Sequence, residues 1–450
     1  MLYKILKLLM QGTTRVFFRS ITIKNKEAIP GNGPLIILAN HPSTFMDPIV
    51  IASIVNREVF FLGKGELFKG AFAKWLLPKL NIIPVYRKQD DPTQMNKNTD
   101  TFNKCYEHLE KGGVLLIFPE GVSITERKLK PIKTGASRIA LGAEARNDFK
   151  LGVRIVNIGL NYADQHKFNR DLFINVHNAI PVTAFADEFK KDEFNAAEEI
   201  TEEIRKQMER LVISIQDKRV DNLVKDIETL YKHQLKQERG VSGHDTETEF
   251  SITQNIVKAV DYYSEINPSF VEAMRVRIKN YFEQLEAFNI EDEDISRNRS
   301  NDSFFRSNTK SFFFLIIGFP FYLYGLINNY LPFEIPALFA KKAKDFRGAI
   351  GMVVGMFTFL IFDTAQILLV HHFFHRPLLT LAYAISLPLS GFFTYYYWHT
   401  FDKIRAKWFL IMLFYKRSAG IANLIAERES IIAEFEKIRT DFLQKFPDII

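Results

Sequence analysis

The sequence has 450 residues, of which 47% are hydrophobic and 42 are Phe, with a formal net charge of +7 and a single cysteine, Cys105. This length predicts two or three modules, the Phe-rich composition is typical of proteins that meet lipid, and the lone cysteine excludes an internal disulfide framework and fits a reducing compartment. The positive charge favours a phosphate group or a membrane surface as partner, and the lack of a zinc-finger, basic-zipper or RNA-binding signature argues against nucleic acid.

Residues 1–25 are predicted to form an amphipathic helix on the membrane surface. Within the first twenty residues, basic side chains interrupt the apolar ones at helical spacing and no acid is present: Lys4, Lys7, Arg15 and Arg19. A cleaved signal peptide would need an unbroken apolar stretch, which these cations exclude. We therefore expect a helix lying on the bilayer, with an ordinary helix packed on the following domain as the alternative.

Residues 26–181 alternate between short apolar runs and helical stretches. The predicted strands are Pro34–Ala39, Glu58–Leu62, Ile82–Tyr86, Val114–Phe118, Val153–Leu160 and Leu172–Val176. The predicted helices between them are Phe68–Leu77, Thr93–Lys111 and Thr134–Arg146. This alternation predicts an α/β domain with a substantially buried sheet.

Residues 182–308 are predicted to be a charged helical region ending in a linker. Charged residues dominate, and apolar residues recur at helical spacing at Ile200, Ile204, Met208 and Leu211. An irregular break is expected at Glu238–Thr248, and the Asn- and Ser-bearing run from Glu291 to Asn308 reads as the linker.

Residues 309–400 carry the pattern of a membrane module, and residues 401–450 that of a C-terminal helical tail. Ser311–Phe333 and Pro377–Trp398 contain no charged residue, and Gly348–Val370 contains only Asp363. Each run is long enough to span a hydrocarbon core, so two or three transmembrane helices and an integral membrane protein are expected. Asp363 would need a partner there, such as a histidine of the 371–375 segment, a place near the boundary, or a role as a lipid or proton site.

The basic clusters leave two orientations open. With three spans, the cluster at 341–347 and the cluster at 403–407 lie on one side and Arg306 and Lys310 on the other. The positive-inside rule then puts the two clusters in the cytoplasm and the N-terminal domain outside it. If the first run, with Pro320 and Asn328-Asn329, is instead re-entrant, every cluster and the N-terminal domain face the cytoplasm.

Two short segments carry the candidate chemistry: Asn40–Asp47, which reads NHPSTFMD, and Phe118–Ser123, which reads FPEGVS. His41 directly follows a predicted strand and Asp47 begins the next helical run. A carboxylate on the far nitrogen of an imidazole fixes its tautomer and supports the imidazolium, so such a pair can take a proton from an alcohol. Asp47 before Pro48 is also the pattern of a helix N-cap, which is compatible with that role.

These two segments, in this order and about eighty residues apart, resemble the glycerolipid acyltransferase family, which comprises glycerol-3-phosphate and lysophosphatidate acyltransferases. The resemblance covers residues 34–181. The family usually has four residues between the histidine and the aspartate, and this chain has five. The resemblance implies that His41 deprotonates the acceptor hydroxyl and that Asp47 orients His41. It also implies acyl-CoA or acyl carrier protein as co-substrate, with no cofactor and no metal.

The resemblance further implies four substrate-binding residues. Arg87 falls where the family has an arginine that binds the acceptor phosphate, although the usual glycine of that block is missing, and Lys64 is a second candidate phosphate contact. Glu120 and Gly121 would help to bind the acceptor, and Lys128, Lys130 and Lys133 could attract anionic substrate. Taken alone, each cation would be a solvated surface residue and Pro-Glu-Gly an ordinary turn.

The expected function is therefore transfer of a fatty acyl group to glycerol-3-phosphate or its 1-acyl derivative in phospholipid biosynthesis, with the catalytic domain on the cytoplasmic face. Membrane lipids, the acyl donor and a glycerol phosphate acceptor are the expected partners. The long C-terminal membrane module favours the glycerol-3-phosphate type. Two alternatives stay open: a lysophospholipid-remodelling acyltransferase, and an inactive membrane protein that binds lipid.

Overall fold

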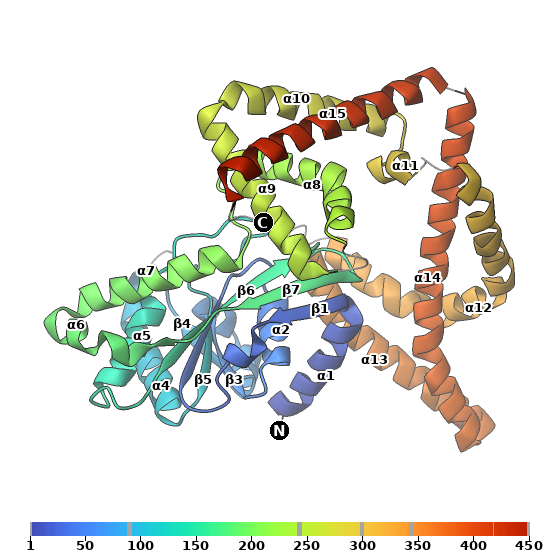
Figure 1. Ribbon diagram of the computed structural model, residues 1–450. Coiled ribbons are helices and arrows are strands. Elements are labelled where there is room, and N and C mark those ends of the chain that lie inside the picture. The colour runs from blue at the N-terminus through green and yellow to red at the C-terminus, as the bar shows by residue number, and fades with distance from the viewer. Residues whose placement is uncertain are drawn as a thin grey trace. The chain divides into compact units, whose positions relative to one another are not determined.

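The computed structural model describes residues 2–87, 92–240, 245–297, 301–341, 346–416 and 418–447 (Figure 1). The chain divides into two compact units. Unit 1 comprises Met1–Gln216 with Ala340–Val353, and unit 2 comprises Asp217–Phe339 with Val354–Ile450.

Unit 1 is built on one eight-stranded sheet in the order β1-β7-β6-β2-β5-β3-β4, with β8 paired to β6. The strands are β1 (Phe18–Lys24), β2 (Leu35–Ala39), β3 (Val59–Lys64), β4 (Ile82–Val85), β5 (Val114–Ile117), β6 (Arg154–Tyr162), β7 (Arg170–Val176) and β8 (Ile180–Pro181). Strands β6, β2, β5, β3 and β4 run parallel to one another, whereas β7 is antiparallel to β6 and parallel to β1. The sheet is therefore mixed, and its centre is a parallel block whose strands end at one edge.

Helices cover both faces of this sheet, and the handedness of the crossover connections determines which helix lies on which face. The connections β2–α2–β3 and β3–α3–β4 step one way across the sheet, and β4–α4–β5 and β5–α5–β6 step back. Right-handed crossovers then place α2 and α3 on one face and α4 and α5 on the other. The bounds of the helices in this unit are α1 (Leu2–Phe17), α2 (Met46–Ile54), α3 (Ala71–Lys79), α4 (Asn98–Glu110), α5 (Gly135–Ala145), α6 (Ala186–Lys191) and α7 (Glu193–Leu211), with short 3₁₀ turns at Lys26–Ala28, Gly65–Phe68, Pro92–Lys97 and Val182–Phe185.

Two apolar cores lie on the two sides of the sheet. One joins β2 and β5 to α4, α5 and α7, and contains the fully buried Leu109, Ile139 and Ile200. The other joins the sheet to α2 and to the start of α13, and contains Met46 and Ala349. This architecture confirms the predicted α/β domain, and each of the six predicted strands is present with shifts of a few residues at its ends.

The predicted helix over residues 1–25 is too long. The helix ends at Phe17, and Phe18–Lys24 forms β1, which pairs in parallel with β7. Ile21, Thr22 and Ile23 are β-branched residues that favour a strand, and they gain a pairing partner about 150 residues away that the local sequence does not reveal.

The helical periodicity predicted after residue 182 is present, and its first part belongs to unit 1. Ile200, Ile204, Met208 and Leu211 are buried on α7 against the sheet. The predicted helix over 93–111 is divided into a 3₁₀ turn and α4, and α3 begins at Ala71, three residues later than predicted.

Unit 2 begins with α8 (Lys218–Glu238), α9 (Thr246–Ile266), α10 (Pro268–Ala287) and α11 (Asp292–Arg297), and ends with α15 (Ser418–Lys445). Asp217 and Asp245 cap α8 and α9 through their side chains, as N-cap residues do. Of the predicted break at Glu238–Thr248, residues 241–244 lie outside the described residues. The predicted linker at 291–308 is instead α11 and the start of α12, with 298–300 outside the described residues.

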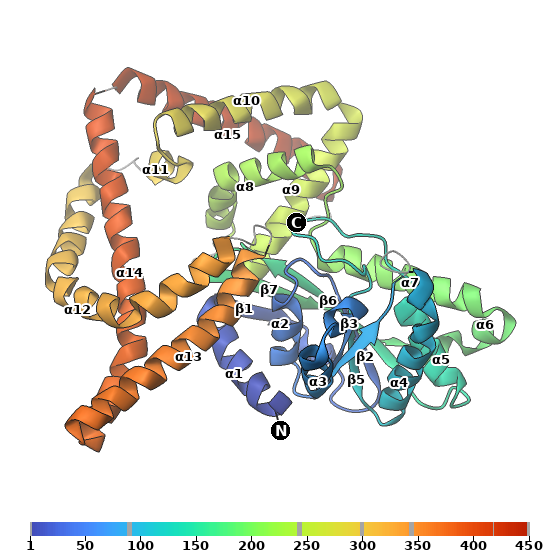
Figure 2. The same cartoon turned by 180° about the vertical axis from the view of Figure 1, so that it is seen from behind.

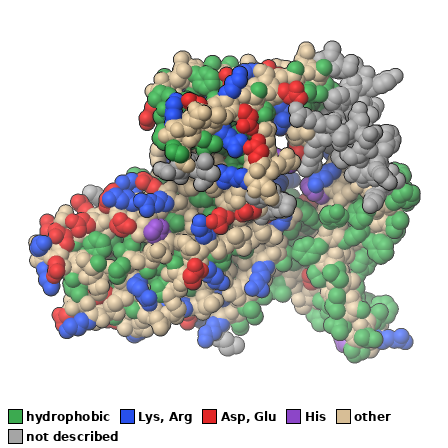
Figure 3. Space-filling view, viewed as in Figure 1, with side chains coloured by type: hydrophobic (Ala, Val, Ile, Leu, Met, Phe, Trp, Pro, Cys, Tyr) green, Lys and Arg blue, Asp and Glu red, His purple; other side chains and the backbone are tan. Residues whose placement is uncertain are grey.

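Three long apolar helices complete the chain: α12 (Asn301–Lys341), α13 (Arg347–Phe374) and α14 (Pro377–Lys416), of which the end of α12 and the start of α13 belong to unit 1. Ser311–Lys341, Arg347–Phe374 and Pro377–Arg405 are long and apolar enough to cross a membrane, as predicted for the three runs. Figure 3 shows hydrophobic side chains gathered over α13 and α14. Of the basic residues used to predict orientation, Lys342 and Lys344 lie outside the described residues.

Prolines inside α12 release backbone carbonyls that side chains of α13 recover. Pro332 and Pro336 lack an N–H, so the carbonyls of Asn328 and Pro332 lose their helical donor. Gln366 donates to the Asn328 carbonyl at 3.1 Å and Thr358 donates to the Pro332 carbonyl at 2.9 Å. These bonds explain how α12 stays helical through both prolines while changing direction along its length (Figures 1 and 2).

A histidine partner is one of the alternatives for Asp363, and Asp363 Oδ1 has none in the part of the chain that the structure describes. Asp363 Oδ1 is buried without a hydrogen-bond partner among the described residues, and His371 contacts Thr380 through Nδ1 at 3.2 Å.

Candidate active site

The sequence-predicted residues gather at the edge where the parallel strands end. His41 follows β2, the Phe118–Gly121 turn follows β5, and Arg87 follows β4. Strands β2 and β5 are neighbours, yet the chain leaves β2 for α2 on one face and leaves β5 for α5 on the other. In open α/β sheets, ligands bind at the carboxyl ends of two strands whose connections diverge in this way.

His41 and Asp47 are in direct contact. The His41 Nδ1 atom lies 2.8 Å from Asp47 Oδ2, and the side chain of Asp47 is fully buried while that of His41 is 17% exposed. A nitrogen facing a carboxylate carries the proton, which leaves Nε2, the other ring nitrogen, as the acceptor. The extra residue between them is absorbed by the loop, in which Thr44 adopts a left-handed conformation with φ +38°.

Three groups bind the carboxylate of Asp47: the His41 imidazole, the Ser43 amide and the Tyr162 hydroxyl. Asp47 Oδ2 also accepts from the Ser43 amide at 2.7 Å, and Asp47 Oδ1 accepts from the Tyr162 hydroxyl at 2.7 Å. Loss of hydration and the nearby carboxylate raise the pKa of Tyr162 well above its ordinary value, so the phenol stays a donor. The N-cap interpretation of Asp47 is wrong, because α2 begins at Met46 after Phe45 and Asp47 lies in its first turn.

The imidazole of His41 is stacked on Phe118. The ring centroids are 3.8 Å apart and the planes are inclined by 12°. Phe118 follows β5, so the two strands hold the ring between a carboxylate at its edge and an aromatic ring at its face. This contact restricts the imidazole to one orientation.

Glu120 lies in the protein interior. It is 3% exposed, and its two oxygens accept from the backbone amides of His41 at 3.2 Å and Lys130 at 2.9 Å. Burial raises the pKa of this carboxyl, while the two amide bonds oppose the rise. The contact that Glu120 makes is therefore with the backbone of His41, and its contact with an acceptor stays a prediction.

Ser123 connects the two motifs through one hydroxyl. It donates to the His41 carbonyl at 2.8 Å and accepts from the Thr44 amide and the Thr44 hydroxyl, both at 3.1 Å. A serine hydroxyl has one hydrogen and two lone pairs, so all of its bonding capacity is used on this loop.

Two cations converge on Gly121. The Arg87 guanidinium donates to the Gly121 carbonyl, and a Cβ placed on Gly121 would lie 2.7 Å from Lys133 Nζ. Gly121 has φ +72°, a conformation that glycine adopts without strain. Lys64, at the end of β3, forms a 2.5 Å ion pair with Glu66, and its phosphate-binding role stays a prediction.

Sequence reasoning did not assign roles to Tyr162, Phe118 and Ser123. Phe118 and Ser123 flank the Pro-Glu-Gly turn, so their place in the motif was a signal that was available. Tyr162 ends β6 and meets Asp47 only through the order of strands in the sheet, so no local pattern marks it. Among the residues that the structure describes, no group of three or more His, Cys, Asp and Glu side chains could hold a metal ion.

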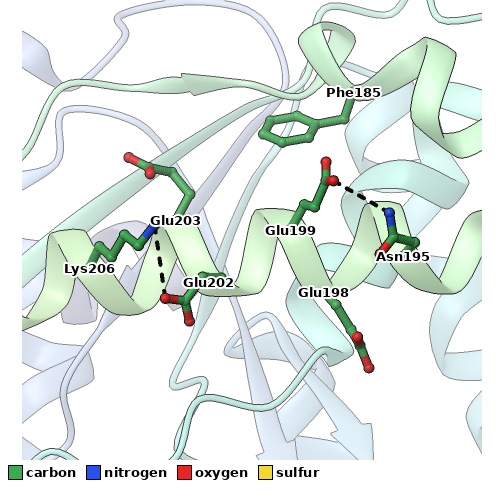
Figure 4. A pocket seen from close by; sticks show the side chains of 7 residues that line it. All are labelled: Phe185, Asn195, Glu198, Glu199, Glu202, Glu203 and Lys206. Carbon is green, nitrogen blue, oxygen red and sulfur yellow. Dashed lines mark hydrogen bonds and ion pairs between the residues drawn. The ribbon is translucent and has the colours of Figure 1, made fainter.

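A hollow elsewhere on unit 1 lies along α7 and has a volume of about 500 Å³ (Figure 4). It is lined by Phe185, Asn195, Glu198, Glu199, Glu202, Glu203 and Lys206. Four carboxylates against one ammonium group repel a phosphate, and none of the predicted site residues lines this hollow.

The chain is similar to proteins of known activity. Residues 20–160 match the family model described as "Acyltransferase". The chain is 21% identical to glycerol-3-phosphate O-acyltransferase 1 of Saccharomyces cerevisiae over 482 aligned residues, which cover 84% of this chain and 62% of that protein. It is 28% identical over 144 residues to a chloroplastic 1-acyl-sn-glycerol-3-phosphate acyltransferase of Arabidopsis thaliana, covering 32% of this chain and 36% of that protein.

Among solved structures, the 1-acyl-sn-glycerophosphate acyltransferase of Thermotoga maritima matches with a TM-score of 0.34 and 21% identity, over 46% of this chain and 77% of that chain. This chain spans less than two thirds of the length of the yeast and plant relatives.

Proposed function

Residues 20–160 form an acyltransferase-family domain whose distant homologues are glycerol-3-phosphate and lysophosphatidate acyltransferases, and from this premise we propose that the protein transfers a fatty acyl group from a thioester to a hydroxyl of a glycerol phosphate. The observation that carries the proposal is the 2.8 Å contact between His41 Nδ1 and Asp47 Oδ2. It leaves Nε2, the other nitrogen of a fixed ring, as a proton acceptor.

The reaction proceeds in one displacement at the thioester carbonyl. His41 Nε2 takes the proton of the acceptor hydroxyl as the oxygen attacks, and the new C–O bond forms. The tetrahedral intermediate collapses with cleavage of the C–S bond, and the imidazolium returns its proton to the leaving sulfur as the thiol departs. Asp47 supports the transient positive charge on the ring, and Phe118 and Glu120 hold the ring and the backbone of His41.

The acceptor phosphate is bound by Arg87, which follows β4, and by Lys133, which precedes α5. Arg87 reaches the Gly121 carbonyl, and Lys133 Nζ lies over Gly121, so both charges stand beside the residues that follow Phe118. Guanidinium groups pair well with phosphate oxygens. Lys64, at the end of the neighbouring β3, is a further phosphate contact in this proposal.

Glycerol-3-phosphate is the proposed acceptor. The alignment with the yeast protein named as a glycerol-3-phosphate acyltransferase extends over 84% of this chain, whereas the alignment with the plant lysophosphatidate enzyme covers 32%. The donor is acyl-CoA or acyl carrier protein. Because such thioesters are found in the cytoplasm, the proposal places the catalytic unit on the cytoplasmic face of a membrane that the chain crosses through two or three of its apolar helices.

The test is thiol release by the purified full-length protein in detergent, with glycerol-3-phosphate and lysophosphatidate offered separately. A thiol-reactive dye is suitable because Cys105 is fully buried and burial raises the pKa of its thiol to about 12, so the enzyme itself does not react. We expect release that depends on the acceptor and falls by roughly 10²–10⁴-fold in His41→Ala, the contribution usual for a general base.

Release without any acceptor dependence would contradict the proposal, and release only with another lysophospholipid would make the protein a remodelling enzyme. No release with several donors would favour a lipid-binding protein. Asp47→Asn is the matched variant that tests the carboxylate, because it preserves the size of the side chain and removes the charge that faces His41.

A further inference from the structure

Helix α3 (Ala71–Lys79) exposes its apolar side chains. All nine residues of the helix are described, and none of them is buried. Phe72 is 71% exposed and Trp75 is 55% exposed, and Leu67 in the preceding turn is 45% exposed. Every other helix of nine or more residues in unit 1 buries at least three residues, so α3 is shaped for contact with something other than the sheet.

Within residues 69–79 the charges have one sign, whereas the exposed Glu66, which pairs with Lys64, lies beside Leu67. The segment from Lys69 to Lys79 carries three lysines and no acid: Lys69, Lys74 and Lys79. All three are exposed, and Lys79 Nζ lies 3.8 Å from the centroid of the Trp75 ring. Aromatic rings flanked by lysines on a short helix are the composition of segments that lie in the interface of anionic bilayers.

The position of α3 in the fold agrees with this partner. The helix lies on the face of the sheet that also carries α2 and α1 (Figure 2), and α1 exposes Ile5 and Leu8, which flank Lys7 in the sequence. The first residues of α13 pack on this same face, where Ala349 and Met352 belong to its core. α13 then continues as a candidate membrane span.

The opposite face of the sheet carries charges of both signs. Helix α7 also carries an exposed aromatic residue, Phe194 at 75%, but it stands among carboxylates such as Glu193 and Glu198. Figure 3 shows acidic and basic side chains mixed over this region of unit 1. A face of mixed charge has no uniform attraction for an anionic surface, which makes Phe194 a matched control for Trp75.

We propose that Leu67, Phe72 and Trp75, with Lys69, Lys74 and Lys79, form a docking surface through which the catalytic unit rests on an anionic lipid bilayer. The aromatic rings enter the boundary between headgroups and acyl chains, and the lysines extend to the lipid phosphates. Acyl transfer is not required for this docking. The docking would hold the site around His41 beside the membrane in which acylated products collect.

The test uses tryptophan fluorescence of the full-length protein reconstituted in vesicles of phosphatidylcholine and phosphatidylglycerol. The chain has three tryptophans, so the Trp398→Phe/Trp408→Phe variant leaves Trp75 as the sole emitter. We expect lipids brominated at shallow acyl positions to quench Trp75 more strongly than lipids brominated deep in the chain, with weak quenching by aqueous acrylamide. This order follows from a docking depth of about 5–10 Å.

The control variant replaces all three tryptophans by Phe and introduces Phe194→Trp, for which we expect the reverse pattern. Lys69→Glu/Lys74→Glu should reduce lipid quenching of Trp75 and increase acrylamide quenching, and circular dichroism checks that this variant is folded. Quenching of Trp75 by acrylamide alone overturns the proposal by placing α3 in water. Quenching by neither reagent overturns it as well, because α3 is then covered by protein.

Discussion

The Tyr162 hydroxyl donates a 2.7 Å hydrogen bond to Asp47 Oδ1, so the last residue of β6 holds the carboxylate that faces His41. The base is thus fixed by three strands that lie side by side: His41 follows β2, Phe118 follows β5, and Tyr162 ends β6. Each contributes one restraint on the imidazole or on its partner. The separation of these restraints allows each to be tested alone.

Tyr162→Phe should lower kcat by roughly tenfold or more and leave KM for the acceptor unchanged. A hydrogen bond to a charged group contributes about 1.5–3 kcal/mol, and its loss lets the carboxylate of Asp47 turn away from His41. Initial rates with the preferred acceptor measure both parameters. An increase in KM with kcat unchanged would mean that Tyr162 contacts the substrate and does not act through Asp47.

Gly121→Ala should weaken acceptor binding more than the backbone strain alone explains. The new Cβ would enter the space of Lys133 Nζ, 2.7 Å away, and displace this ammonium group from the turn. Gly112→Ala is the matched control, because Gly112 has φ +71° but a Cβ there meets nothing within 4 Å. Both variants bear the cost of about 1–2 kcal/mol for a side chain in the left-handed region.

The measurement for this pair is KM for the acceptor together with the thermal midpoint. Equal losses of stability with a raised KM only in Gly121→Ala would support the role of Lys133. Equal KM values in the two variants would remove Lys133 from the phosphate site.

Ser123→Ala should lower kcat and increase the mobility of the loop between His41 and Asp47. The variant leaves the amide and hydroxyl of Thr44 without their acceptor and the His41 carbonyl without one donor. Each unsatisfied group costs about 1–3 kcal/mol if it stays buried. Ser123→Thr keeps the hydroxyl and should retain most of the activity, and an equal loss in both variants would show that side-chain volume matters rather than this hydrogen-bond network.

The sequence was sufficient for the parts of the fold that local patterns encode. Alternating apolar runs predicted the six strands from β2 to β7, and three uncharged or nearly uncharged runs predicted α12, α13 and α14. It was insufficient for β1, because its partner β7 lies about 150 residues away and basic residues continue from α1 into the strand. It was also insufficient for Tyr162, since only the order β6-β2-β5 brings the end of β6 to Asp47.

The candidate site shows the same division. The spacing of His41 and Asp47 left their contact open, and the structure shows how one extra residue is accommodated by the left-handed Thr44 and the Ser123 hydroxyl. A motif could place Glu120 in the site but could not tell an exposed carboxylate from a buried one, because that depends on which amides surround it.

Glu120 should make the stability of the protein depend on pH in a direction opposite to that of an ordinary paired carboxylate. Its pKa in the folded protein is raised, chiefly by burial, above the ordinary value of 4.5. As pH rises past 4.5 the unfolded chain loses this proton first, so the unfolded state binds fewer protons than the folded state and the free energy of unfolding falls. The stabilisation that protonated Glu120 contributes to the folded state is fully present below pH 4.5 and is lost by the time the pH has passed the folded-state pKa.

Glu120→Gln removes this titration and keeps one carbonyl acceptor for the His41 or Lys130 amide. The thermal midpoint of the parent protein should therefore fall relative to that of this variant as the pH rises through that window. Midpoints of both proteins in the same detergent, measured at several pH values from 4 upward, provide the test. A difference that shifts in favour of the parent over the same range would mean that the two amide hydrogen bonds outweigh burial and that the ionised form of Glu120 is the one that holds His41 in place.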